Sequence, residues 1–289
     1  MNRKDVQLIL KELNIIPKKR LGQNFLIDNA TRDIIIKQAQ ISKNDIILEI
    51  GPGLGALTEK LVETAKKVYA VELDSRLSSF LTDNFSDYQN LKIINGDILK
   101  INIPEHNKVV SNIPYKITGP ILEKVFFNKD PPHGILTIEK AIADRIFSYE
   151  TYKTLSRITM SVNTFMKPIK KHKISRNSFY PTPNIDLALV NLSPRQSIDK
   201  FLINDFQRTF YLKILEGIMP FKNKNLANAL ELCIKKKLKL NLNKRDILNI
   251  LEQNKIENNK VYSYKVSNFV EISKIFYNKI ERIKKREQD

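Results

Sequence analysis

The chain is poor in the residues that form disulfides and metal sites. Its 289 residues include one cysteine, Cys233, so no internal disulfide can form, which agrees with a reducing, cytoplasmic setting. Cys233 lies in an apolar stretch, which predicts a buried thiol rather than a nucleophile. The histidines are scattered without metal-ligand spacing, so we expect no metal site; they are His106, His133 and His172.

Long apolar runs are missing as well. No stretch approaches the roughly 20 apolar residues of a membrane helix, so we expect no membrane partner. The N-terminus is polar and contains Asp5 and Glu12, which argues against a secretory signal and against an acid-poor transit peptide. Residues 1–17 predict a short amphipathic helix that covers the domain or contacts a partner.

Acidic residues are outnumbered. Lys and Arg total 49 against 31 Asp and Glu, a net charge of +18 that favours a polyanionic partner such as nucleic acid. A source organism with Lys-, Ile- and Asn-rich proteins would explain part of this excess. The distribution favours phosphate binding over a merely solvated face, because residues 151–185 contain seven basic side chains and no acidic one.

A strand and a glycine-rich turn indicate a nucleoside site. The apolar run Ile46–Ile50 predicts a strand that leads into Gly51–Gly55 and then a helix over 56–62. A second strand ends in Glu72, about 20 residues on, where a carboxylate usually accepts hydrogen bonds from ribose hydroxyls. A third leads to Asp97, whose carboxylate is placed to meet an adenine amine.

The glycine spacing distinguishes between ligands. It reads G-x-G-x-G instead of the dinucleotide pattern G-x-G-x-x-G, and Pro52 removes a backbone N–H that a pyrophosphate would need. These departures favour a nucleoside without phosphates, such as S-adenosylmethionine, over NAD. Each turn taken alone is also compatible with an ordinary connection between a strand and a helix that binds no ligand.

A fourth strand, near Val109–Ser111, runs into Asn112-Ile113-Pro114-Tyr115. Pro114 fixes its own φ and biases Ile113 towards extended geometry, which aims the Asn112 side-chain oxygen and the Ile113 carbonyl at one point. Two acceptors there would bind the two N–H bonds of an adenine amine, with Tyr115 stacked on the ring. The alternative is an Asx-type turn with a core tyrosine.

The alternating strands and helices predict an α/β fold, a Rossmann-like doubly wound domain over residues 1–195. After residue 195 glycine nearly vanishes and helical patterns take over, which predicts a small basic helical domain over 196–289. Residues 199–289 contain 20 basic and 11 acidic side chains, a net charge of +9. Apolar residues at three- and four-residue steps from Phe269 predict a long amphipathic helix, and Met219–Lys224 predicts a break between helices.

From about Lys18 to Ser193 the chain resembles the KsgA/RsmA family of small-subunit ribosomal RNA adenine N6-dimethyltransferases. The shared motifs, in the family's order, are Lys19–Leu26, Glu49–Gly55, Glu72–Asp74, Gly96–Asp97, Asn112–Tyr115 and Phe179–Pro183. The resemblance implies a class I fold, S-adenosylmethionine as cofactor, and a monomer that modifies ribosomal RNA within a pre-small-subunit particle.

The resemblance also implies residue roles. The cofactor would be bound by Gln23, Asn24, Leu26, Gly51, Gly53, Glu72, Leu73, Asp97, Ile98 and Asn112. The target adenine would be held by Asn112, Ile113, Pro114 and Tyr115, and Phe179 would close on its other face. RNA contacts are expected at Lys18, Lys19, Arg20, Lys116, Lys170, Lys171, Lys173, Arg176, Lys222 and Lys224, although Lys222 and Lys224 fit a plain capping loop equally well.

Two modest departures from the family pattern occur, and neither touches the expected chemistry, although Lys116 could alter local RNA contacts. Lys116 replaces the Asn or Gln that often follows the tyrosine, and Ile138-Glu139-Lys140 stands where the family commonly shows Gln-Lys-Glu. Other activities stay open, because large-subunit methyltransferases also carry an N-I-P-Y form. DNA adenine methyltransferases typically have N/D-P-P-Y, which Ile113 does not match. The alternative from a different class is a protein that acts mainly by binding during ribosome assembly, with methylation as a secondary activity.

Overall fold

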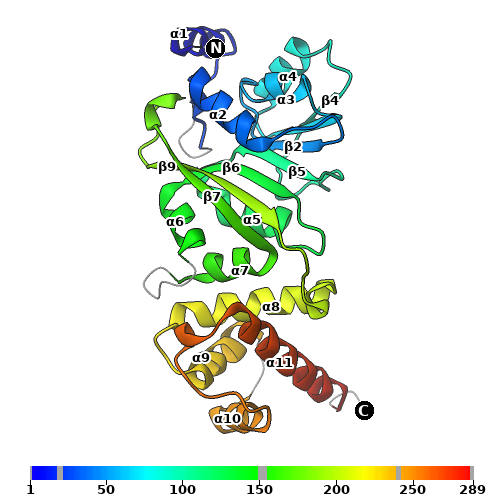
Figure 1. The fold of residues 1–289 in the computed structure, drawn as a ribbon, viewed down its shortest axis with the longest axis vertical. Coiled ribbons are helices and arrows are strands. Elements are labelled where there is room, and N and C mark those ends of the chain that lie inside the picture. Colours follow the sequence, from blue (N-terminus) through cyan, green and yellow to red (C-terminus); the bar gives the residue numbers. More distant parts are fainter. Residues whose placement is uncertain (1, 18–21, 149–154, 239–241, 287–289) are drawn as a thin grey trace. The chain divides into compact units, whose positions relative to one another are not determined.

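The computed structural model describes residues 2–17, 22–148, 155–238 and 242–286. The chain forms two compact units (Figure 1). The first comprises Met1–Phe126, Asp130–Phe147 and Met166–Pro194, and the second comprises Phe127–Lys129, Ser148–Phe165 and Arg195–Asp289. The second unit therefore takes in two segments, 127–129 and 148–165, that the predicted division at residue 195 assigned to the first.

A seven-stranded sheet forms the centre of the first unit (Figure 1). Its strand order is β4 (Leu91–Asn95), β3 (Lys67–Glu72), β2 (Ile46–Ile50), β5 (Lys108–Asn112), β6 (His133–Glu139), β9 (Leu187–Pro194) and β7 (Met166–Ile174). The pairings from β4 to β6 are parallel, and β9 is antiparallel to both of its neighbours. This confirms the predicted α/β class.

The strand order explains how four predicted strand ends meet. Because β4, β3, β2 and β5 are adjacent and parallel, their carboxyl ends lie along one edge of the sheet. The residues that follow these strands, among them Gly51, Glu72, Asp97 and Asn112, are thereby brought together from positions up to 61 residues apart in sequence.

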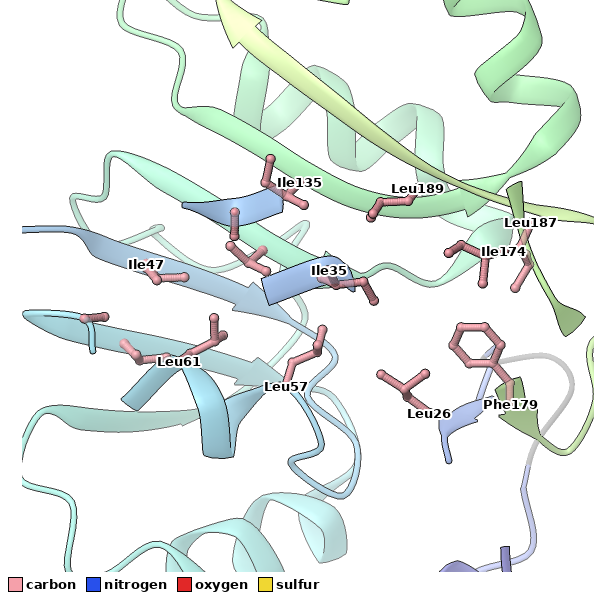
Figure 2. Close-up of a cluster of buried hydrophobic side chains, with 14 of the residues drawn as sticks. Leu26, Ile35, Ile47, Leu57, Leu61, Ile135, Ile174, Phe179, Leu187 and Leu189 are labelled. Atoms are coloured by element: carbon pink, nitrogen blue, oxygen red, sulfur yellow. The ribbon is translucent and has the colours of Figure 1, made fainter. Parts of the chain in front are cut away.

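Helices complete the first unit. They are α1 (Arg3–Glu12), α2 (Asn29–Ala39), α3 (Thr58–Val62), α4 (Ser75–Asn84), α5 (Thr118–Phe126) and α6 (Lys140–Phe147). Asn2 begins α1 with a capping box, and Asp28 begins α2 by accepting a hydrogen bond from the Thr31 N–H at 3.0 Å. Ile35 of α2 and Leu61 of α3 are fully buried in the cluster that also contains Ile47 of the sheet (Figure 2).

A small second sheet joins two distant segments. β1 (Phe25–Leu26) pairs antiparallel with β8 (Phe179–Tyr180), and Leu26 lies opposite Phe179 in the register. The two side chains face one another at one end of the same cluster, with Leu187 and Ile174 nearby (Figure 2). The segment before α2 is thereby fixed to a segment about 150 residues later.

The second unit is helical (Figure 1). Its α-helices in the described part of the chain are α7 (Arg157–Phe165), α8 (Asp205–Ile218), α9 (Leu226–Cys233), α10 (Lys244–Gln253) and α11 (Val266–Arg286). Short 3-10 turns occur at Tyr115–Ile117 and Arg176–Ser178 in the first unit. In the second unit they occur at Lys200–Leu202, Met219–Phe221 and Val261–Ser263, and a π-helical turn covers Ile234–Leu238.

Packing in this unit agrees with the sequence pattern. Phe269, Ile272 and Phe276 of α11 are fully buried, as predicted for an amphipathic helix, and the 3-10 turn at Met219–Phe221 is the predicted break. Cys233 is buried as predicted, against Gly217 of α8, where an added Cβ would lie 2.2 Å from the Cys233 Sγ. Glycine at position 217 therefore permits the close approach of α8 and α9.

Candidate functional site

A cavity of about 260 Å³ opens at the carboxyl ends of β2, β3, β4 and β5. All but one of the residues predicted to bind a cofactor line it: Gln23, Asn24, Gly51, Gly53, Glu72, Leu73, Asp97, Ile98 and Asn112. The cavity wall is mostly apolar, with a few polar groups directed inward from the strand ends. This combination is typical of a site for a small organic ligand.

Glu72 is the buried acceptor of this cavity. Its side chain is 6% exposed, and its carboxylate accepts hydrogen bonds from the Gly53 N–H at 3.2 Å and the Asp74 N–H at 3.0 Å. Burial raises the pKa of Glu72, while these backbone donors oppose the shift. Each oxygen keeps a lone pair, so the carboxylate can still accept from two ligand hydroxyls.

Asp97 and the glycine-rich turn complete the polar side. The Leu99 N–H donates to Asp97 Oδ1 at 2.9 Å, and Oδ2 has no hydrogen-bond partner in the described part of the chain. Gly53 has φ +62°, and an added Cβ there would lie 3.0 Å from the ring of Phe25. The backbone of the turn is left-handed at Gly53, where a side chain would meet Phe25. Because glycine has no side chain, a ligand in the cavity can approach the backbone of the turn closely.

Asn112 has a defined side-chain orientation. Its Nδ2 donates to the Asn24 carbonyl at 3.2 Å, and its Oδ1 accepts from the Tyr115 hydroxyl at 3.0 Å. The two bonds fix which end of the amide is which, and Oδ1 retains one lone pair. Burial raises the pKa of Tyr115 far above its ordinary value, so this hydroxyl remains a donor.

The two aromatic residues expected to stack on the base, Tyr115 and Phe179, are buried in the structure. Tyr115 is 8% exposed and Phe179 is 1% exposed, and both belong to the buried cluster around Leu26, in which Figure 2 shows the Phe179 ring. Phe179 is held inside by the β1–β8 pairing, and stacking on a base stays a prediction for both rings. The Tyr115 hydroxyl donates to Asn112, and Tyr115 also lines a second cavity beside the first.

Leu26 is the one predicted cofactor residue outside the wall of the main cavity. It does not line the main cavity, because its position in β1 directs the side chain into the core beside Phe179. Its neighbour Phe25 takes the wall position. Alternation along a strand explains this exchange, since adjacent residues face opposite sides.

A second cavity, of about 330 Å³, adjoins the first. Gly22, Gln23, Asn24 and Lys116 line both cavities. The rest of its wall is Pro17, Tyr115, Glu139, Pro181, Thr182, Pro183, Asn184 and Ile185. Most of these residues were not predicted as site residues, although Tyr115, Pro181, Thr182 and Pro183 belong to the motifs Asn112–Tyr115 and Phe179–Pro183.

The predicted phosphate-binding residues fall into three groups. Lys18, Lys19 and Arg20 lie outside the described residues. Lys116, Lys170, Lys173 and Lys224 are exposed. The remaining cations have partners: Lys171 pairs with Asp144 at 2.6 Å, Arg176 lies 3.6 Å from Asp186, and the Lys222 ammonium donates to the Leu155 carbonyl at 3.1 Å. The basic stretch is therefore partly neutralised by acids outside it.

The part of the chain that the structure describes shows neither a metal cluster nor a membrane span. Within residues 2–17, 22–148, 155–238 and 242–286, no three His, Cys, Asp or Glu side chains form a group that could hold a metal ion. The same residues contain no helix long and apolar enough to cross a membrane.

Comparisons with known proteins agree with this geometry. The family model for ribosomal RNA adenine dimethylase matches residues 16–272. A protein of Methanococcoides burtonii named "Probable ribosomal RNA small subunit methyltransferase A" is 39% identical over 208 residues, 72% of this chain and 75% of that protein. A Listeria monocytogenes protein named ribosomal RNA small subunit methyltransferase A is 34% identical, over 77% of this chain and 78% of that protein.

A solved structure gives the same result for the fold. The dimethyladenosine transferase from Plasmodium falciparum superimposes with a TM-score of 0.70 and 28% sequence identity, covering 88% of this chain and 98% of that one. The similarity therefore extends through both compact units.

Proposed function

The chain belongs to the ribosomal RNA adenine dimethylase family, and on that premise we propose that it converts adenines of small-subunit ribosomal RNA to N6,N6-dimethyladenosine. The relatives that carry a small-subunit name support the choice of subunit. The observation that carries the proposal is the oriented Asn112 amide at the mouth of a cavity that also contains Glu72 and Asp97.

The methyl donor is S-adenosylmethionine, and the residues present fit it. Glu72 would accept from the ribose hydroxyls, and the unpaired Oδ2 of Asp97 would accept from the adenine amine. Leu73, 52% exposed, offers an apolar surface to the base. When bound, the donor supplies a methyl group made electrophilic by a sulfonium centre, so the protein's task is to position and stabilise.

Asn112 would act on the nucleophile. The N6 lone pair of adenine is delocalised into the ring, and acceptors at Asn112 Oδ1 and the Ile113 carbonyl would favour a more tetrahedral nitrogen during attack. Because these bonds strengthen as the nitrogen changes geometry, they stabilise the transition state more than the bound substrate. Tyr115 holds Oδ1 in place through its hydroxyl. Holding the two reactants in line can contribute about 7–11 kcal/mol.

The RNA would be bound by exposed cations. Lys170 and Lys173 on β7, Lys116 at the cavity and Lys224 of the helical unit are available for phosphates, whereas Lys171 and Arg176 already have acidic partners. We also infer that the protein acts as a monomer in the cytoplasm, on a pre-small-subunit particle. The net charge of +18 supports association with such a polyanion.

The test is a methyl-transfer assay on intact particles. Labelled S-adenosylmethionine is incubated with the protein and either unmodified small or unmodified large ribosomal subunits, and RNA nucleosides are analysed by mass spectrometry. We expect N6,N6-dimethyladenosine in small-subunit RNA alone. Label confined to large-subunit RNA would move the target to the other subunit, and absence of label with intact cofactor binding would refute the proposal.

An Asn112→Ala variant separates catalysis from assembly. If subunit maturation in cells fails with this variant although the protein still binds the particle, methylation is the principal role. If maturation proceeds normally while methylation is lost, the protein acts mainly as an assembly factor. Cofactor affinity, measured by calorimetry, serves as the control for folding.

A further inference from the structure

An unpaired carboxylate lies in the second cavity. Glu139 is the last residue of β6 and lines this cavity with Tyr115 and Lys116. Thr137 is the strand partner of Asn112, so Glu139 stands two residues further along, about 7 Å beyond the level of Asn112. Its side chain is partly buried and has neither a hydrogen bond nor an ion pair within the described ranges.

A carboxylate at this position needs a donor from the substrate. Phosphates of an approaching RNA would repel it, and removing it from water without a partner costs free energy. RNA offers two kinds of donor, the N–H groups of bases and the 2′-hydroxyl of ribose. Carboxylates commonly accept from ribose hydroxyls, which is the role of Glu72 towards the cofactor under the proposed function.

The position of Lys116 favours the 2′-hydroxyl over the base N–H groups as the donor to Glu139. Its exposed ammonium lies on the same cavity, and no ion pair joins it to Glu139 or to another acid of the described segments. A cation and a carboxylate on one cavity match the phosphate and the 2′-hydroxyl of a single nucleotide, whereas the edge of a base would not call for the cation. Pro183 and Ile185 provide an apolar wall beside them.

We propose that Glu139 and Lys116 form a ribonucleotide subsite next to the reacting adenine, in which Glu139 accepts a hydrogen bond from a 2′-hydroxyl and thereby selects RNA over DNA. The subsite deepens the proposed function and rests on it. Glu139 is a specificity residue here: it touches the sugar and takes no part in methyl transfer.

The experiment uses single-atom changes in the RNA. Once the dimethylated adenines are mapped, a stem-loop containing them is synthesised with all ribose, and again with one 2′-deoxyribose at each nucleotide in turn from two before to two after the target. Competition with small subunits for the wild-type protein gives affinity, and labelled S-adenosylmethionine gives methylation. Glu139→Ala, Glu139→Gln and the exposed control Glu105→Ala are measured with the same set.

We expect one deoxy position to weaken binding by the wild-type protein about tenfold, as for loss of a hydrogen bond to a charged group. Glu139→Ala should bind the all-ribose RNA about tenfold more weakly and be indifferent to that position. Glu139→Gln keeps an acceptor and should regain most of the discrimination, while Glu105→Ala should match the wild-type protein.

Three results would overturn the subsite: no deoxy position matters to the wild-type protein, Glu139→Ala keeps the discrimination, or the all-ribose stem-loop fails to compete. Failure of the proposed function looks different, since the wild-type protein would then produce no dimethyladenosine in small-subunit RNA at all.

Discussion

Glu49 offers a sharp test of how the cofactor side of the sheet is built. The residue lies on β2, is 1% exposed, and accepts a hydrogen bond from the Thr58 hydroxyl at 2.7 Å. Burial raises its pKa from 4.5 to about 8; the Thr58 bond opposes this, and the nearby Glu72 adds to it. The folded protein therefore retains a proton that the unfolded chain releases above pH 4.5.

The sign and size follow from this difference. Stability contributed by neutral Glu49 is complete below pH 4.5, falls as pH rises towards 8, and is lost above it. At about 1.4 kcal/mol per pH unit, the full difference amounts to about 5 kcal/mol. Glu49→Gln keeps an acceptor for Thr58 but cannot ionise, so its stability relative to the wild-type protein should increase steadily across this range.

Urea unfolding, followed by circular dichroism at half-unit steps from pH 5 to pH 9, measures the difference directly. The exposed Glu12→Gln is the matched control, and we expect its difference from the wild-type protein to stay level with pH. Parallel stability curves for Glu49→Gln and the wild-type protein would refute the reasoning, because they would mean that Glu49 ionises alike in the folded and unfolded states.

Three further predictions concern the base site, the RNA surface and the helical unit. Tyr115→Phe removes the donor to Asn112 Oδ1, and we expect turnover to fall about tenfold with unchanged cofactor affinity in steady-state assays; equal losses in both would contradict the positioning role. Replacing Lys170 and Lys173 together with Gln should lower the salt-dependence slope of RNA binding by about 1.5, measured by anisotropy titration, whereas Lys171→Gln should have little effect because Lys171 already pairs with Asp144. Gly217→Ala should destabilise the protein by about 1–3 kcal/mol in thermal unfolding despite the better helix propensity of alanine, because the new Cβ meets Cys233; a Cys233→Ala background that fails to relieve the loss would disprove that cause.

The strand-end residues could be predicted because their positions depend on local patterns. Apolar patterns predict four strands, whose last residues are Ile50, Glu72, Asn95 and Asn112. Parallel strands place their carboxyl ends on one edge of the sheet whatever the order of the strands. Most of the cofactor cavity follows from this rule. The order of the strands and the pairing of β1 with β8 depend on contacts between distant segments, which periodicity does not encode.

At the base site, the sequence motifs do not predict which aromatic side chains are buried. Tyr115 and Phe179 are aromatic residues in motifs next to a nucleotide site, and stacking is the obvious inference. Both are buried in a cluster with Leu26, which lies far from each of them in sequence. Glu139 departs from the family pattern, and only the structure shows that it lines the same cavity as Lys116.

The β1–β8 pairing has a consequence for synthesis of the protein. Phe25 is a wall of the cofactor cavity, and its strand is held in place by Phe179 and Tyr180. A ribosome making this chain releases β1 early and β8 only about 150 residues later. Until then Leu26 lacks its partner and the cavity lacks a fixed wall, so the nascent chain cannot bind its cofactor firmly. We therefore expect firm cofactor binding only after β8 has been synthesised and has paired with β1, when nearly the whole first unit has emerged.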